Sequence, residues 1–200
     1  MSAATPQEAV TWWNLPNQLT LSRFGMAVLL FVLISYQFWA CCLIVFVVAA
    51  ITDWLDGYLA RRWKMGTALG RNLDPLADKV LNCGAFIFLL PLGQAGGWLL
   101  PWMVAVIVLR ELIITSLRSF METAGSKFGA DWLGKIKMVL QCAALVAIFI
   151  LLTPHEPSPT WTAVYWLTVV LVYGTVITTL LSGVQYLWRA VTLFGTAPGT

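Results

Sequence analysis

Charged residues are scarce in this sequence. Only 10% of its 200 residues are Asp, Glu, Lys or Arg, whereas 60% are hydrophobic, and the mean hydropathy is +0.81. Soluble globular domains carry about 25% charged residues, so this composition excludes that class and indicates an integral membrane protein. No basic stripe on a polar surface accompanies the net charge of +3, so we expect no nucleic-acid partner.

The sequence also lacks the residue patterns of zinc, redox and histidine-based catalytic sites. The four cysteines lie in apolar runs without CxxC spacing, so we expect them to be buried apolar side chains. His155 is the only histidine, and it lies in a loop beside Glu156 and Pro157, so we expect no catalytic role for it. The first twenty residues have no basic segment ahead of an apolar run, so we expect no cleavable signal peptide.

Six apolar segments are long enough to cross a bilayer, which requires about 20 residues in a helix. We therefore predict an all-α integral membrane protein with six transmembrane helices in a single domain, residues 1–200. Residues 1–16 would be a juxtamembrane segment with a short N-terminal interfacial helix, and residues 190–200 a tail. The six predicted spans are residues 19–36, 38–60, 75–92, 98–120, 133–152 and 161–188.

Basic residues are distributed unevenly between the two ends of these spans. The connections at 35–37, 93–97 and 153–160 contain no Lys or Arg, whereas nearly all basic residues lie toward the opposite ends. Because cytoplasmic loops of membrane proteins are enriched in Lys and Arg, we predict that both termini face the cytoplasm.

Four of the nine acidic residues fall within one 26-residue window. Asp53 and Asp56 are three residues apart, and Asp74 and Asp78 are four apart, so on helices each pair shares a face. Carboxylates near hydrocarbon are costly, at roughly 2.5–3.5 kcal/mol on insertion scales, unless they are paired or bind a metal. Two such faces can converge on divalent cations, and this arrangement predicts metal-assisted phosphoryl chemistry.

The residue types in this window suit Mg²⁺ or Mn²⁺ with a nucleotide. Both ions prefer carboxylate and phosphate oxygens, and two of them can clamp a pyrophosphate. Gly57 and Ala60 leave room near the first pair, and Arg61 can bind a phosphate. Asp74 precedes Pro75, which is favoured at the first helical position, so we expect Asp74 at a helix N-terminus. The alternative is that the carboxylates only pair with nearby basic residues, which would not account for all four.

A second group of polar residues lies on predicted spans four and five. Arg110, Arg118, Lys135 and Lys137 are basic, and such a group favours an anionic ligand such as a phosphorylated acceptor. The alternative is that they are ordinary positive-inside anchors. Glu111 is adjacent to Arg110 and would point to a different face, so we expect that the two do not simply neutralise each other.

The spacing Asp53-x2-Asp56-Gly57-x2-Ala60-Arg61-x8-Gly70-x3-Asp74-x3-Asp78 resembles the signature of the CDP-alcohol phosphatidyltransferase family at all eight positions. The resemblance implies that the four aspartates bind two Mg²⁺ or Mn²⁺ ions and that Asp78 also deprotonates the acceptor hydroxyl. It further implies a homodimer and contacts between the cytidine diphosphate group of the donor and Gly57, Ala60, Arg61 and Gly70.

Three flanking stretches, residues 14–24, 110–120 and 134–141, resemble the bacterial branch of this family that uses glycerol 3-phosphate. This resemblance implies transfer of the phosphatidyl group from CDP-diacylglycerol to glycerol 3-phosphate, at the cytoplasmic face of a bacterial inner membrane and among membrane lipids. Asn17 and Thr20 match positions that border the nucleotide, although helix capping explains them equally well. Inositol phosphate, serine or phosphatidylglycerol remain alternative acceptors, and a cation transporter or a non-catalytic scaffold are alternatives of other classes.

Overall fold

The computed structural model describes residues 15–63, 68–123, 132–154 and 158–195. Side chains are described for these residues except 15–20, 53–63, 68–78, 120, 122–123, 190 and 193–195. The described residues form helices and no strand, which confirms the all-α prediction. The six helices are α1 (Leu15–Ser35), α2 (Trp39–Trp63), α3 (Ala68–Gly96), α4 (Pro101–Thr123), α5 (Trp132–Leu152) and α6 (Pro159–Gly195).

Two helix boundaries correct the sequence predictions. α3 begins at Ala68, so Asp74 and Pro75 lie inside the helix, and the expected helix N-terminus at Asp74 is wrong. Residues 190–195 were predicted as part of the tail, but they continue α6 as far as Gly195. The predicted interfacial helix falls mostly on residues 1–14, outside the described residues.

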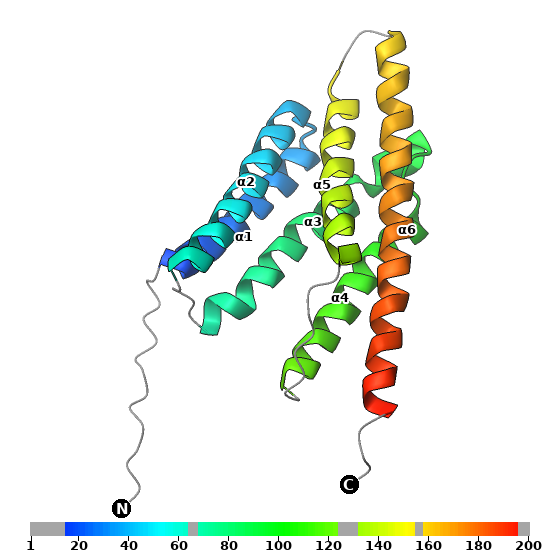
Figure 1. Cartoon of the computed structure of the whole chain (residues 1–200). Helices are drawn as coiled ribbons and strands as arrows, with labels where there is room; N and C mark the ends of the chain where they lie inside the picture. The colour runs from blue at the N-terminus through cyan, green and yellow to red at the C-terminus, as the bar shows by residue number, and fades with distance from the viewer. Residues whose placement is uncertain (1–14, 64–67, 124–131, 155–157, 196–200) are drawn as a thin grey trace, which may run out of the picture.

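The helices pack as two groups, which are joined by contacts of α3 with α4 and α5 and of α2 with α5 (Figure 1). α1 packs against α2 and α3, and α6 packs against α4 and α5, while α3 also contacts α4 and α5. The start of α1, the end of α2, the start of α3, and the ends of α4 and α6 lie toward the same end of the molecule, at the bottom of Figure 1. The acidic window therefore lies at that end.

Three of the described segments are long and apolar enough to cross a membrane: Lys79–Gly96, Trp132–Leu152 and Pro159–Arg189. The apolar parts of α1 and α2 that are described, Leu21–Ser35 and Trp39–Thr52, are shorter. α4 contains Arg110, Glu111 and Arg118, which lower its hydropathy. The length and composition of the three segments fit a membrane protein, and the count of six spans stays a prediction.

Aromatic contacts and a close helix approach hold α1 to α3 and α2 to α5. The ring of Phe31 on α1 stacks on Phe88 of α3 with centroids 4.8 Å apart. A Cβ atom at Gly84 would lie only 2.2 Å from the Phe31 ring, so the absence of a side chain there lets α1 approach α3. Phe46 and Phe149, both fully buried, join α2 to α5 with ring centroids 5.9 Å apart.

The turn after α1 and the turn after α3 end their helices in the same way. Gln37 and Gly97 have φ angles of 60° and 73°, and each N–H bonds to the carbonyl three residues earlier. The next N–H in each turn bonds to the carbonyl five residues earlier, which is the Schellman arrangement. Glycine adopts this conformation without a steric cost, whereas Gln37 does so despite its side chain.

The cysteine prediction holds only in part. Cys42 is buried and Cys83 and Cys142 are partly buried, but Cys41 is exposed. Because Cys41 follows Ala40 on the outer side of α2, it belongs to the apolar surface rather than to the core.

Candidate functional site

The acidic window occupies the last part of α2 and the first part of α3. Asp53 and Asp56 lie on α2, and Asp74 and Asp78 lie on α3. Because both stretches are helical, the three- and four-residue spacings place each pair on one helical face, as predicted. The four side chains lie outside the described residues. The other described His, Cys, Asp and Glu side chains form no group of three that could hold a metal.

The residues predicted to contact the nucleotide lie on three helices that pack together. Gly57, Ala60 and Arg61 lie on α2, Gly70 lies on α3, and α1 carries Asn17 and Thr20. α1 contacts both α2 and α3. This arrangement brings the backbones of all three segments into one region, while the roles of the side chains stay predictions.

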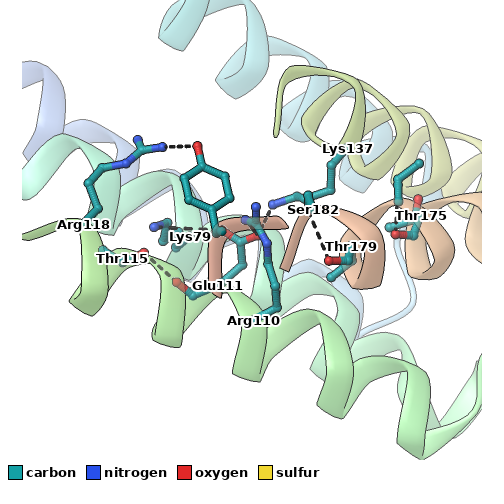
Figure 2. A network of polar contacts seen from close by, with 11 residues as sticks. Lys79, Arg110, Glu111, Thr115, Arg118, Lys137, Thr175, Thr179 and Ser182 are labelled. Atoms are coloured by element: carbon teal, nitrogen blue, oxygen red, sulfur yellow. Dashed lines mark hydrogen bonds and ion pairs between the residues drawn. The ribbon is translucent and has the colours of Figure 1, made fainter. Parts of the chain in front are cut away.

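Glu111 is the centre of a buried cluster of charges (Figure 2). Its carboxylate accepts hydrogen bonds from Lys137 on α5 and from Nη1 of Arg110 at 3.1 Å. Its Oε2 atom lies 3.9 Å from Nζ of Lys79 on α3. Glu111 is 6% exposed and Lys137 5% exposed, so these charges interact in a region from which water is largely excluded.

Tyr186 on α6 supports the two arginines of α4. Its hydroxyl accepts a hydrogen bond of 2.8 Å from Nη2 of Arg118. The guanidinium carbons of Arg110 and Arg118 each lie 5.7 Å from the centre of the Tyr186 ring, within the range of cation–π attraction. One buried aromatic side chain therefore fixes two cations.

Three of the four residues predicted to bind an acceptor phosphate come together. Arg110 and Lys137 meet at Glu111, and Arg118 meets Arg110 at Tyr186. Lys135 is exposed, and because it lies two residues before Lys137 on a helix it faces a different direction.

The structure corrects the prediction for Arg110 and Glu111. Their side chains do interact, although neighbours on a helix start out in different directions. The Nε atom of Arg110 is buried and has no hydrogen-bond partner among the described residues. Buried donors of this kind are rarely left without an acceptor, so an acceptor from outside the described residues would complete the hydrogen bonding of this N–H.

Sequence reasoning missed the roles of Lys79 and Tyr186 and the central position of Glu111. Glu111 is the only acidic residue in the middle of α4, and Lys79 directly follows Asp78, so the sequence already indicated that both positions could belong to a polar site. Nothing in the sequence indicated such a role for Tyr186, because an aromatic residue near the end of an apolar helix also fits an interfacial anchor.

Buried hydroxyl groups on α6 extend from this cluster along the helix. They share one face at helical spacing and are fully buried. Figure 2 shows three of them on the same side as Lys137. The hydroxyl oxygens of Thr175 and Thr179 have no partner among the described residues. The members of this stripe are Thr168, Thr175, Thr179 and Ser182.

An apolar groove of about 240 Å³ opens between α2 and α5. On α2 it begins at Ile51, two residues before Asp53, and continues away from the acidic window. Its lining offers almost no polar surface, so it suits a hydrocarbon chain. The lining residues are Phe46, Val47, Ala50, Ile51, Cys142 and Val146.

Known proteins resemble this chain over most of its length. The model of a family described as CDP-alcohol phosphatidyltransferase matches residues 13–192. A Sodalis glossinidius protein named CDP-diacylglycerol–glycerol-3-phosphate 3-phosphatidyltransferase is 42% identical over 141 residues, 68% of this chain and 76% of that protein. Proteins of the same name from Pectobacterium atrosepticum and Yersinia enterocolitica are 40% and 41% identical, with the same coverage of 68% and 76%.

Proposed function

Because the chain belongs to the CDP-alcohol phosphatidyltransferase family, we propose that it transfers the phosphatidyl group of CDP-diacylglycerol to glycerol 3-phosphate and releases CMP. The names of relatives at 40–42% identity support this donor and acceptor. The single observation that carries the proposal is the contact between Lys79 and Glu111. Because Lys79 follows Asp78 on α3, that contact brings the basic cluster next to the acidic window.

The acceptor phosphate would bind at the basic cluster. Lys79, Arg110 and Lys137 surround one carboxylate, so three cations against one anion leave an excess of two positive charges. Arg118 adds a further cation beside Arg110. A phosphate dianion would offset most of this positive charge, and the buried Nε of Arg110 would donate to one of its oxygens. Lys135, which is exposed, would contribute from the rim of the site.

The aspartates would hold two Mg²⁺ or Mn²⁺ ions. The donor set fits, because four carboxylates on two helices supply the hard oxygen ligands that these ions prefer. When bound, the ions would stabilise charge on the pyrophosphate. Asp53, Asp56, Asp74 and Asp78 are the proposed ligands.

Asp78 would act as the general base. It would take the proton of the acceptor hydroxyl as that oxygen bonds to the phosphorus that carries diacylglycerol. The bond from this phosphorus to the CMP oxygen would break, and CMP would leave with the electron pair.

The donor nucleotide would be held by residues of α1, α2 and α3. Arg61 would hold the departing phosphate through charge-assisted hydrogen bonds. The small residues Gly57, Ala60 and Gly70 would let the cytidine approach the helices, and Asn17 and Thr20 would lie at its edge.

The donor's hydrocarbon tails would lie in the membrane, with one in the groove between α2 and α5. The groove starts beside Asp53 on α2, so a donor with its pyrophosphate at the aspartates could extend a chain directly into it. The apolar lining supports this orientation.

For the whole protein we propose a single domain with six spans, as a homodimer in a bacterial inner membrane. Both termini and the acidic window would face the cytoplasm. The common end at which α1 begins and α6 ends supports an even number of crossings (Figure 1). Bacterial relatives support the membrane assignment.

CMP release from CDP-diacylglycerol, measured in detergent with a panel of acceptors, tests the function. We expect release that requires glycerol 3-phosphate, stops in excess chelator and resumes with Mg²⁺ or Mn²⁺. Release that instead requires inositol phosphate, serine or phosphatidylglycerol would reassign the acceptor. Full activity in chelator would refute the metal assignment, and the absence of CMP release with every acceptor would refute the proposed enzymatic activity.

A further inference from the structure

Glu111 is a carboxylate at the centre of a site that otherwise collects positive charge. It is buried halfway along α4 and contacts cations from α3, α4 and α5. A site built only to attract phosphate would gain nothing from a carboxylate, since its charge weakens the attraction for an anion. The presence of Glu111 therefore needs a separate explanation.

Stability alone does not explain the cluster. Replacing a buried group of charges by apolar residues of similar size is often neutral or stabilising. Apolar residues in place of Glu111 and of the cations around it would therefore serve the packing of these helices as well.

The need to orient the cations does explain the presence of Glu111. The lysine ammonium group sits on a flexible stem with free rotation about several bonds, and immobilising such a side chain when a ligand binds lowers affinity. Glu111 already holds Lys137 at one oxygen, and the same oxygen accepts Nη1 of Arg110. Its second oxygen lies near Lys79, the residue that follows Asp78.

The geometry points to Glu111 as the positioning residue of the acceptor site, which orients Lys137, Arg110 and Lys79 for the phosphate of the acceptor. The inference rests on the proposed function. Glu111 would not touch the reacting atoms. It would set where the acceptor phosphate binds relative to α3, and through Lys79 it would link that position to Asp78.

Two substitutions at this position separate orientation from charge. Glu111→Gln keeps the size of the side chain and removes the charge, whereas Glu111→Asp keeps the charge and shortens the reach. If Glu111 acted only by its charge, Glu111→Gln would make the site more positive and lower the KM for glycerol 3-phosphate. If it orients the cations, both variants raise that KM, by about tenfold or more for Gln.

The experiment measures KM for glycerol 3-phosphate, KM for CDP-diacylglycerol and kcat with the full-length protein in detergent. We expect a large rise in the first, a much smaller change in the other two, and a smaller rise for Glu111→Asp than for Glu111→Gln. Ser116→Ala is the matched control, because Ser116 is an exposed polar residue on the same helix. An unchanged or lowered KM for glycerol 3-phosphate in Glu111→Gln would overturn the inference.

A double variant guards against loss of the fold. Glu111→Gln with Lys137→Met removes both charges of the most buried pair, so Lys137 is not left without its carboxylate. Because Glu111 acts through Lys137, the double variant should raise the KM less than the product of the two single effects. Independent effects, or loss of folded protein in all three Glu111 variants, would overturn the inference. Failure of the proposed function would look different, since the unmodified protein would then not use glycerol 3-phosphate at all.

Discussion

Asp78 occupies the position where proton transfer and metal binding can be told apart by substitution. It lies one helical turn beyond Asp74 on α3 and directly before Lys79. As both general base and metal ligand, Asp78→Asn should lower kcat by about 10²–10⁴-fold and also weaken the affinity for CDP-diacylglycerol, whereas a general base without a metal role would leave that affinity nearly unchanged. Single-turnover rates and donor affinity measure the two effects.

Asp53→Asn is the comparison for this test. Asp53 is proposed as a metal ligand only, so its variant should lose metal-dependent donor binding together with turnover. A mixed defect in Asp78→Asn would mean that Asp78 serves in both roles. Near-normal turnover would exclude it as the base.

Arg118 and Tyr186 provide the second residue-scale prediction. Arg118→Ala should raise the KM for glycerol 3-phosphate by about ten- to a hundredfold, because a hydrogen bond to a charged group contributes about 1.5–3 kcal/mol. Tyr186→Phe keeps the ring beneath both arginines and removes only the hydroxyl that accepts from Arg118, so a smaller rise is expected. Steady-state kinetics with each substrate varied in turn measure both. A loss of donor affinity with normal acceptor kinetics in Arg118→Ala would show that the basic cluster serves the donor.

At the scale of helices, the sequence was sufficient to predict those features that depend on a local residue pattern. Apolar runs predicted the six helices, and the spacing within the acidic window predicted which aspartates share a face. The start of α3 was missed because Pro75 resembles a first helical residue, whereas α3 continues through it from Ala68. Proline inside a helix leaves one carbonyl without its usual donor, which membrane helices tolerate with the help of neighbours.

Contacts between helices distant in the sequence could not be predicted in this way. Arg118 and Tyr186 are 68 residues apart, and Lys137 and Glu111 are 26 apart. Their meeting depends on how α4 packs against α6 and on the approach of α5. Hydrophobic periodicity shows that a helix has a buried face but does not identify its partner.

The groove between α2 and α5 gives a prediction at this scale. Ala50→Trp should fill the groove and raise the KM for CDP-diacylglycerol with long acyl chains, while a donor with short acyl chains should be affected little. Val48→Trp is the control, because Val48 is exposed on α2 and does not line the groove. Kinetics with the two donors measure the difference. Equal effects on both donors, or equal effects of the two substitutions, would contradict a hydrocarbon chain in this groove.

For the whole molecule, the arrangement of helices separates the polar sites from the apolar groove. The acidic window lies toward the end where α1 begins and α6 ends (Figure 1), and the Glu111 cluster adjoins it through Lys79. The apolar groove extends away from the window along α2. A water-soluble acceptor and CMP could thus exchange with one aqueous compartment while the lipid tails stay in the membrane.

The orientation of the six helices leads to the last prediction, which uses cysteine labelling. In a variant without Cys41, Cys42, Cys83 and Cys142, single cysteines would replace Gln37, Gln94, Thr160 or Thr192, all exposed. Positions 37, 94 and 160 lie at the turns without basic residues, and Thr192 lies near the other end of α6. A membrane-impermeant maleimide should therefore label the first three in intact cells and Thr192→Cys only after permeabilisation.

Each variant must retain CMP release, which shows that it is folded. Protection of position 37 or 94 while position 160 is labelled would mean that fewer than six helices cross the membrane, and labelling of position 192 alone would place the acidic window outside the cell.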